Sequence, residues 1–513
     1  MRYLDCQPGS YVGDSDATLS RYVKELTRLL ERTQREFAYD TLRLRRRPLQ
    51  ELAGILVDFA GDVHGDVGLW KTYEQYNVEF FGVPLPLTTP ERPQGIHEER
   101  IRHLLWVLYP QAIAGLTLAP DHRDLQRMAA ASARFLNETI PDLRKESGVK
   151  EFLSMPNEFG WDVKRKLVWL GTKSYLFRLP YRNYIADHNN GEEDISATDD
   201  FICQECACWS GLGVIDILAG TLEISESERR ELRSWYERHV APYRLLSVNA
   251  ETLEALNLVS NERYTIRIHM DPPPFKVGQV VFGGLTPWRG EWYWSGQQQV
   301  WSSMTQADVE EVVQAMRRRH SQIVCRYWKD YERQVRERAA RIHETMLAYH
   351  KTDLAVYPDG LSMAADLQRE MKSMWDAAPP GAVEEVVKRH GLTRGRPDVP
   401  LPDDLLNCKN GVAVFLNRGE GQEIVRQYND IVSGLKKQGE GLTENETAAM
   451  TGIFLDRVLS PAFIRRVAGE YGSESIKAAF HLRKCSEDFW LEYLLRSHKG
   501  CFYRKRYPSL SLV

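Results

Sequence analysis

Apolar residues recur at helical spacing along most of the first 245 residues. The first stripe follows a possible capping residue, Ser15 or Asp16, and comprises Leu19, Val23, Leu26, Leu29 and Leu30. A second stripe follows Pro48, which a first helical turn tolerates, and comprises Leu49, Leu52, Leu56, Phe59 and Val63. Further helices are expected at 101–108, after a cap at Asp121, and at 227–239. These patterns predict a helical domain over residues 1–245.

The apolar period changes to two beyond residue 245. Residues 264–269 alternate between apolar and polar, as a half-buried strand does, and 277–282 and 291–294 are two further strand-like runs. Glycine-rich and proline-rich turns separate these runs. Several short strands so close together indicate a strongly curved sheet or a barrel. We therefore expect a small antiparallel, barrel-like β unit over residues 246–302.

Helical spacing returns at Thr305, and the longest predicted helix covers residues 323–350. Proline-rich stretches at 379–381 and 396–400 are typical of linkers. A strand is expected at 412–416, and a capping box of Thr443 and Glu446 begins a later helix. The sequence thus predicts a long-helix region with a linker over 303–400 and an α/β domain over 401–513. The expected fold is α+β and predominantly α-helical.

Charge excludes a chain that is basic throughout. Lys and Arg number 67 against 71 Asp and Glu, a net charge of -4, which still allows a local basic patch. The start lacks an apolar leader, and the longest uncharged stretch, 103–120, contains two prolines, so neither a secretory signal nor a membrane span is predicted. Eight irregularly spaced cysteines are not a disulfide framework. We expect a soluble, cytoplasmic protein with reduced thiols.

Three cysteines, Cys203, Cys206 and Cys208, lie within six residues, and His188 precedes them by 15 positions. Three thiolates and one imidazole can form a tetrahedral zinc site. On a helix, however, Cys203 and Cys206 would share a face that Cys208 does not. The alternative is that these are small buried thiols. Zinc is therefore one possible cofactor of this chain.

Residues 61–66 read Gly-Asp-Val-His-Gly-Asp. This block resembles the first metal-binding block of the calcineurin-like metallophosphoesterases, which implies Asp62 and His64 as ligands of one of two metal ions. The later blocks of that family, Gly-Asp-x-x-Asp, Asn-His and Gly-His-x-His, do not occur downstream. The helical period of the second stripe also continues through the block, whereas the family places it at the end of a strand. A polar helix end is the alternative.

A second local pattern, Arg-Gly-Glu-Gly at 418–421, follows the predicted strand and precedes a predicted helix at 422–431. A strand, a glycine turn and a helix outline a phosphate-binding turn. Glu420 and Glu423 would repel a phosphate, so a tight turn is the favoured interpretation. The sequence contains neither a Gly-x-Ser-x-Gly elbow nor a His-Glu-x-x-His motif. Whether the protein is an enzyme stays open.

Two features in the middle of the chain favour binding. Residues 317–341 hold nine basic and three acidic side chains, and four of the basic ones follow helical spacing: Arg326, Lys329, Arg333 and Arg336. Just upstream lies a cluster of aromatic residues that includes Trp288, Trp292 and Trp294. Exposed indole rings serve as anchors for peptides or for stacked bases. A core role is the alternative for the tryptophans, and a solvated face is the alternative for the basic helix.

The leading hypothesis is an interaction protein that contacts a protein partner, or nucleic acid, through the basic helix and the aromatic β unit. It depends on the closeness of these features in sequence and on the lack of a complete catalytic set. The alternative is a metal-dependent enzyme or a zinc-stabilised protein. That alternative would use the cysteine cluster, or Asp62 with His64.

Overall fold

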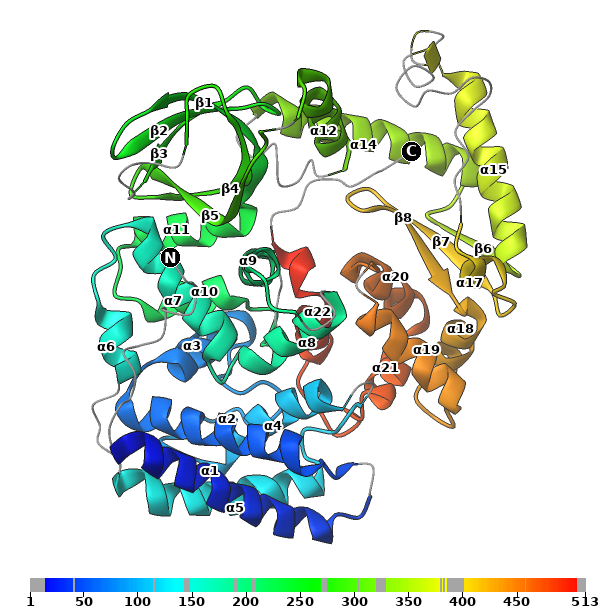
Figure 1. Cartoon of the computed structure of the whole chain (residues 1–513). Helices are drawn as coiled ribbons and strands as arrows, with labels where there is room; N and C mark the ends of the chain where they lie inside the picture. The colour runs from blue at the N-terminus through cyan, green and yellow to red at the C-terminus, as the bar shows by residue number, and fades with distance from the viewer. Residues whose placement is uncertain are drawn as a thin grey trace. The chain divides into compact units, whose positions relative to one another are not determined.

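The computed structural model describes residues 14–39, 42–113, 116–142, 148–188, 192–204, 209–268, 275–302, 304–319, 329–378, 381, 383–384, 401–456 and 458–504. The described residues up to Arg317 form one compact unit together with Lys484–Tyr503, and those between 318 and 483 form a second. Most of the described chain is helical, and its strands make one barrel and one small sheet (Figure 1). The predicted α+β fold is confirmed.

The helical part of the first unit follows the apolar stripes. Its helices are α1 (Asp14–Thr33), α2 (Arg46–Gly65), α3 (Leu69–Phe81), α4 (Glu98–Ala112), α5 (Arg123–Thr139), α6 (Gly148–Ser154), α7 (Gly160–Lys173), α8 (Arg178–His188), α9 (Ile195–Gln204), α10 (Val214–Thr221) and α11 (Glu226–Arg233). Single 3-10 turns lie at η2 (Gln34–Glu36), η4 (Ile140–Asp142) and η5 (Ser234–Glu237). Leu26 and Leu30 of α1 are fully buried, as are Leu49 and Leu56 of α2, because each stripe faces the interior.

Three predicted helix ends are wrong by a few residues. The side chain of His122, not that of Asp121, caps α5 by accepting a hydrogen bond from the backbone N–H of Asp124. Helix α4 runs two residues past Pro110, where a proline removes a hydrogen bond from the last turn only. The helix expected up to residue 239 ends at Arg233, where the 3-10 turn η5 follows it and leads into the strand that begins at His239.

Five strands close into a barrel in the order β1-β2-β3-β5-β4. They are β1 (His239–Val248), β2 (Thr252–Asn257), β3 (Arg263–Arg267), β4 (Val280–Trp288) and β5 (Glu291–Val300). The prediction of an antiparallel unit differs in one pairing, because β3 and β5 run parallel where the barrel closes. The unit also begins at His239 instead of residue 246. A five-stranded Greek-key barrel with this strand order is the architecture of the OB-fold.

Alternating apolar residues fill the barrel. Tyr243 and Leu245 of β1 and Ile266 of β3 are buried there. The register of β4 against β5 shifts at Gly283, opposite the extra residues that β5 carries, and a Cβ atom at Gly283 would lie 3.0 Å from the indole ring of Trp294. Glycine at this position therefore lets an indole lie close over the strand.

The last described helix returns to the first unit. Helix α22 (Trp490–Lys499) and the 3-10 turn η6 (Gly500–Tyr503) pack beside α3 and α4. The ring of Tyr493 stacks on Trp106 with centroids 5.6 Å apart and also meets Phe81. Residues nearly 400 positions apart thus share one core.

The second unit is built around a three-stranded antiparallel sheet in the order β6-β7-β8. Its strands and helices are α14 (Lys329–His350), β6 (Leu354–Tyr357), α15 (Gly360–Ala377), α17 (Asp403–Leu406), β7 (Val412–Asn417), β8 (Gly421–Arg426), α18 (Tyr428–Lys436), α19 (Glu444–Leu455), α20 (Pro461–Tyr471) and α21 (Glu474–Ala479), while α12 (Gln306–Arg319) precedes them. The predicted strand at 412–416 and the capping box of Thr443 and Glu446 are confirmed.

The helix expected at 422–431 is wrong over its first half, because residues Gly421–Arg426 form β8 and helix α18 begins only at Tyr428. Residues 418–420 are the turn of a hairpin between β7 and β8. The buried Glu423 accepts hydrogen bonds from the side chain of Asn417 and the backbone N–H of Ser460, which holds the strand in place. A hairpin is not the strand-turn-helix outline that would bind a phosphate.

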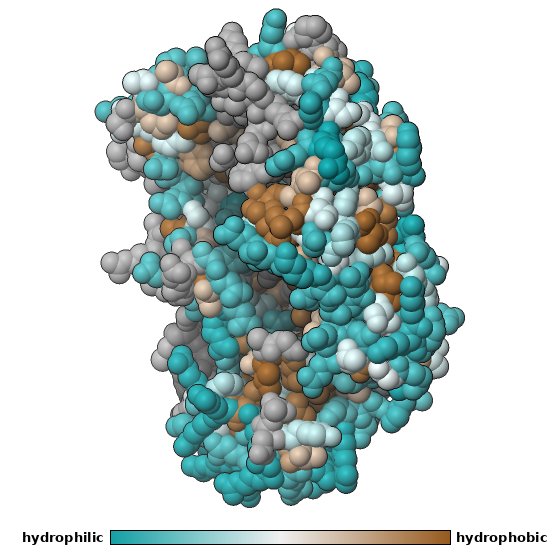
Figure 2. All heavy atoms as spheres, turned by 90° about the vertical axis from the view of Figure 1, so that its right-hand side faces the viewer, coloured by the Kyte–Doolittle hydropathy of each residue, from teal (hydrophilic) through white to brown (hydrophobic). Residues whose placement is uncertain are grey.

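Among the described residues, no helix is long and apolar enough to cross a membrane. Figure 2 shows a face that is largely hydrophilic, on which apolar residues form separate patches. Patches of this kind are ordinary on a protein surface and indicate no binding site by themselves.

Candidate functional site

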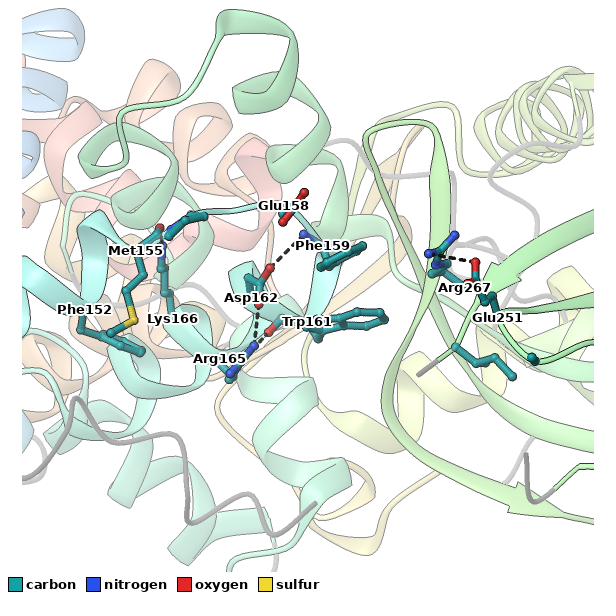
Figure 3. Close-up of a pocket in the computed structure, with 13 residues that line it drawn as sticks. Phe152, Met155, Glu158, Phe159, Trp161, Asp162, Arg165, Lys166, Glu251 and Arg267 are labelled. Carbon is teal, nitrogen blue, oxygen red and sulfur yellow. Dashed lines mark hydrogen bonds and ion pairs between the residues drawn. The ribbon is translucent and has the colours of Figure 1, made fainter. Parts of the chain in front are cut away.

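A cleft of about 920 Å³ lies between helices α6 and α7 and one end of the barrel (Figure 3). Its helical wall includes Phe152, Met155, Glu158, Phe159, Trp161 and Arg165. Its barrel wall includes Ala250 and Glu251 from the β1–β2 turn and Arg267 and Ile268 from the end of β3. All these residues belong to the first unit, so the cleft lies inside one compact body.

An aromatic pair gives the helical wall its character. The rings of Phe159 and Trp161 stack with centroids 4.7 Å apart and planes 25° from parallel. Both side chains are only half-buried, and the neighbouring Met155 is 50% exposed. In Figure 3 both rings extend from α7 toward Arg267 on the barrel. The wall therefore presents apolar surface to whatever enters the cleft.

The loop between α6 and α7 is held from two sides. The Lys166 Nζ donates hydrogen bonds to the carbonyl oxygens of Leu153 (2.9 Å) and Met155 (2.5 Å) and to Asn157 Oδ1 (2.7 Å). From the barrel, Trp288 Nε1 donates to the carbonyl oxygen of Asn157 at 2.9 Å. Burial lowers the pKa of Lys166 to about 8. Its three donors are used by the loop, so this lysine is a structural clamp and not a nucleophile.

Strand β5 rests directly on the start of α7. A Cβ atom at Gly160 would lie 2.6 Å from the ring of Tyr293, a distance that no side chain could accept without displacing the ring. The same ring meets Trp161 edge-on at 5.3 Å, and its hydroxyl donates to Glu291 at 2.6 Å. Glycine at the first position of α7 therefore brings the barrel close enough to form the cleft.

A buried ion network joins the barrel to α7 and α9 at a second place. The fully buried carboxylate of Asp199 pairs with Lys164 and with Arg238. Ser295 Oγ lies 3.0 Å from both carboxylate oxygens and from Lys164 Nζ. Arg238 also pairs with Asp200. Burial lowers the pKa of Lys164, and the network serves to connect secondary-structure elements.

The charges that line the cleft are mostly paired with one another. Arg165 pairs with Asp162, and Arg267 pairs with Glu251 at 3.2 Å (Figure 3). Glu158 is exposed at the rim and has no hydrogen-bond or ion-pair partner among the residues that the structure describes. The carboxylate of Glu158 is therefore the one exposed lining charge that no described residue pairs.

The three predicted tryptophans are placed differently. Trp288 is fully buried and meets Trp235 edge-on at 6.3 Å. Trp292 and Trp294 are half-buried and lie against barrel tyrosines, at 4.9 Å from Tyr264 and 5.6 Å from Tyr243. Trp288 thus supports the loop beside the cleft through its hydrogen bond to Asn157. The other two rings take part in the aromatic packing of the barrel.

The predicted basic helix belongs to the second unit. Arg326 lies outside the described residues, and Lys329 begins α14. Arg333 and Arg336 follow on the same helix, and both are exposed. The tryptophans belong to the first unit. A joint surface of these two groups therefore stays a prediction.

Of the predicted zinc ligands, two are described. Cys203 is buried in α9, with its Sγ 3.9 Å from Lys164 Nζ. His188 is exposed at the end of α8 and stacks on Tyr184 at 4.2 Å. Cys206 and Cys208 lie outside the described residues. Within the described ranges, no group of three His, Cys, Asp or Glu side chains could hold a metal ion, so zinc binding by the cluster stays a prediction.

Asp62 and His64 lie at the end of helix α2, as the continued apolar period predicted. The carboxylate of Asp62 is buried, which raises its pKa. It accepts hydrogen bonds from the Tyr175 hydroxyl and from the backbone N–H groups of Gly68, Leu69 and Trp70. Both oxygens are thus used to cap α3. A metal role of this pair is a hypothesis that no contact described here favours.

The residues that make the cleft were not singled out from the sequence. Phe159, Gly160 and Trp161 are consecutive, and an aromatic-glycine-aromatic triplet at a helix start is the one local signal that could have drawn attention. Arg267 comes from a strand more than 100 positions away. The closure of the cleft is therefore a property of the tertiary structure.

Comparison with known proteins adds one finding. A family model described as "Protein of unknown function (DUF3843)" matches residues 3–199 of this chain. The match ends within α9 and therefore covers the helical wall of the cleft but not the barrel. No curated protein and no solved structure matches the chain.

Proposed function

We propose that this chain is an interaction protein that binds a segment of a protein partner in the cleft between α7 and the barrel. The observation that carries the proposal is the half-buried pair of Phe159 and Trp161 inside a cleft whose walls are held in place. Aromatic side chains in a pocket are the usual energetic centre of a protein interface.

The rigidity of the walls supports binding. The loop at 155–158 is clamped by Lys166 and Trp288, and the barrel is held by the Asp199 network and by Tyr293 on Gly160. A preformed site loses little conformational freedom when it binds, so more of the contact energy appears as affinity.

The barrel supports the location. OB-fold barrels bind their ligands on the face of β2 and β3 and at the adjoining loops. Here the β1–β2 turn and the end of β3 supply Glu251 and Arg267 to the cleft. This argument is an analogy of fold alone.

The charges favour a protein over nucleic acid as the partner. Affinity for nucleic acid comes largely from cations that are available to phosphates. Both arginines that line the cleft are already paired with carboxylates, and Glu158 adds a negative charge. A polyanion would therefore meet repulsion at the rim, whereas a peptide with apolar side chains would not.

Selection from a random-peptide library on the full-length chain tests the proposal. We expect wild-type protein to enrich peptides that Trp161→Ala protein fails to bind. Tyr39→Ala is the matched control, because Tyr39 is 63% exposed on the same unit and does not line the cleft. This control should retain the selected peptides.

Two results would refute the proposal. One is that no enriched peptide depends on Trp161. The other is that a labelled thymidine oligonucleotide binds the wild-type chain at low salt and loses this binding with Trp161→Ala, which would make nucleic acid the ligand of the cleft.

A further inference from the structure

We infer that the cleft selects partner segments that present a lysine or arginine side chain, with Glu158 as the carboxylate that receives it. This inference rests on the proposed function and adds the chemistry of the occupant. It starts from the one lining charge that has no partner among the described residues.

The pairing of the other charges isolates Glu158. Arg165 is neutralised by Asp162, which also accepts a hydrogen bond from the backbone N–H of Phe159 at 2.9 Å. Arg267 is neutralised by Glu251. None of these four side chains needs a ligand to satisfy its charge. The carboxylate of Glu158 gains an ion pair only when something binds, so it contributes a preference for a cation.

Lys166 does not offset this preference, because all three of its donors bind oxygens of the loop on the buried side. It is 2% exposed, so a bound segment cannot reach its ammonium. The exposed Arg165 is already paired with Asp162, so among the described residues the charge left unpaired for an incoming segment at this rim is the carboxylate of Glu158.

The aromatic wall suits the rest of such a side chain. Glu158 directly precedes Phe159, and the guanidinium of Arg267 already lies over the Phe159 ring at 5.9 Å. This contact shows that the wall accepts a guanidinium within the cation–π range. A lysine or arginine from a partner can lay its methylene groups along the half-buried rings and place its charged end at Glu158.

Glu158 also lies where two clefts meet. A second cleft of about 730 Å³ begins on the other side of the loop, and Met155, Pro156 and Glu158 line both. In that second cleft, Lys150 pairs with Asp66 and Arg289 pairs with Glu228, while Lys71 and Glu223 add one charge of each sign. These charges cancel, so Glu158 is the carboxylate in excess that a segment crossing the loop passes from either direction.

The test repeats the peptide selection with charge variants of Glu158. We expect the Trp161-dependent peptides of the wild-type chain to be enriched in Lys and Arg next to an apolar residue. Glu158→Lys should replace this enrichment with Asp and Glu, and Glu158→Gln should abolish it. Glu138→Lys is the matched control, since Glu138 is exposed on α5 and lies outside both clefts, and it should leave the enrichment unchanged.

A selected peptide then provides the quantitative measure. Replacing its basic residue by Gln should weaken binding to the wild-type chain about 1.5- to fivefold, the range of an exposed ion pair. The same replacement should have no effect on Glu158→Gln protein, because the pair is already lost.

The outcomes separate the two proposals. If Trp161-dependent peptides appear without basic enrichment, or if the enrichment survives in Glu158→Lys, the inference about Glu158 is wrong and the proposed function stands. If no Trp161-dependent peptide appears, the proposed function itself falls, and the inference falls with it.

Discussion

The barrel meets helix α7 in two regions that use the same kinds of side chain and differ in burial. At the Asp199 network, Lys164 and Arg238 are almost fully buried, and each has a carboxylate partner. At the cleft, Arg165 is exposed, and Glu158 has no described partner. The first region holds the structure together, and the second is left open to a ligand.

Helix α7 shows the difference within three consecutive residues. Lys164 enters the ion network, Arg165 stays at the cleft, and Lys166 clamps the loop. Successive residues on a helix point about 100° apart, so neighbours in sequence reach different surroundings. A run of basic residues therefore has no single role. The role of each residue depends on how deeply its side chain is buried and on which groups it contacts.

The largest loss of stability is expected from removing the buried carboxylate of the Asp199 network. Asp199→Ala leaves Lys164 and Arg238 buried without their shared carboxylate, which should lower the free energy of unfolding by about 3–5 kcal/mol. The checks are a lower urea midpoint and faster hydrogen exchange in β5. Asp187→Ala, at an exposed position of α8, is the control. A loss no larger than that of the control would show that the network does not hold the barrel.

The clamp predicts a dependence on pH. Burial lowers the pKa of Lys166 from 10.5 to about 8 in the folded chain. Because the folded chain binds this proton less tightly than the unfolded chain does, raising the pH stabilises the fold. The stabilisation is complete above the unfolded pKa of 10.5 and is lost as the pH falls through the folded pKa of about 8. Relative to Lys166→Met, the wild-type chain should gain about 2–3 kcal/mol of unfolding free energy between pH 8 and 10.5. Urea unfolding at several pH values measures this gain.

Lys24→Met, on an exposed position of α1, is the control for that series. Its difference from the wild-type chain should not change over the same pH range. A constant difference for Lys166→Met as well would contradict the burial of the ammonium.

The close contact between the barrel and α7 can be disturbed by adding a side chain at Gly160. Gly160→Ala places a methyl group 2.6 Å from the Tyr293 ring, which must move. We expect a loss of about 1–3 kcal/mol of unfolding free energy, the usual cost of overpacking. The double variant Gly160→Ala with Tyr293→Ala should recover part of this loss. Its failure to do so would mean that the contact is not the source of the cost.

The smallest effect on stability is expected in the cleft. Trp161→Ala removes a half-buried ring and should lower the unfolding free energy by about 1 kcal/mol or less, while abolishing the peptide binding proposed above. A thermal unfolding scan beside the binding measurement separates the two effects. A large loss of unfolding free energy would show that Trp161 serves mainly to stabilise the fold and not to bind a partner.

Local patterns were enough to predict most elements. The stripes of α1 and α2, the strand at 412–416 and the capping box at Thr443 depend on residues close in sequence, and the structure confirms them. The error at 422–431 comes from strand pairing, because residues 421–426 pair with β7 across a tight turn and Glu423 is also held by Ser460. Pairing with another strand overrides a weak local preference for helix.

The candidate site was largely hidden from such patterns. The conspicuous tryptophans of the β unit are mostly used for packing, Trp288 as a buried support and Trp294 against Tyr243. The sequence shows that indole rings cluster there, but burial depends on which surfaces meet after folding.

The amino-acid sequence alone determined that this chain is α+β and mostly helical, that it contains a curved β unit, and where most of its helices run. The reason is that periodicity and capping are local properties of the chain. Only the tertiary structure decided that the open aromatic surface is Phe159 with Trp161 and that Glu158 stands beside it without a described partner. That arrangement requires β5 to rest on Gly160 from more than 130 positions away, a contact that no local pattern records.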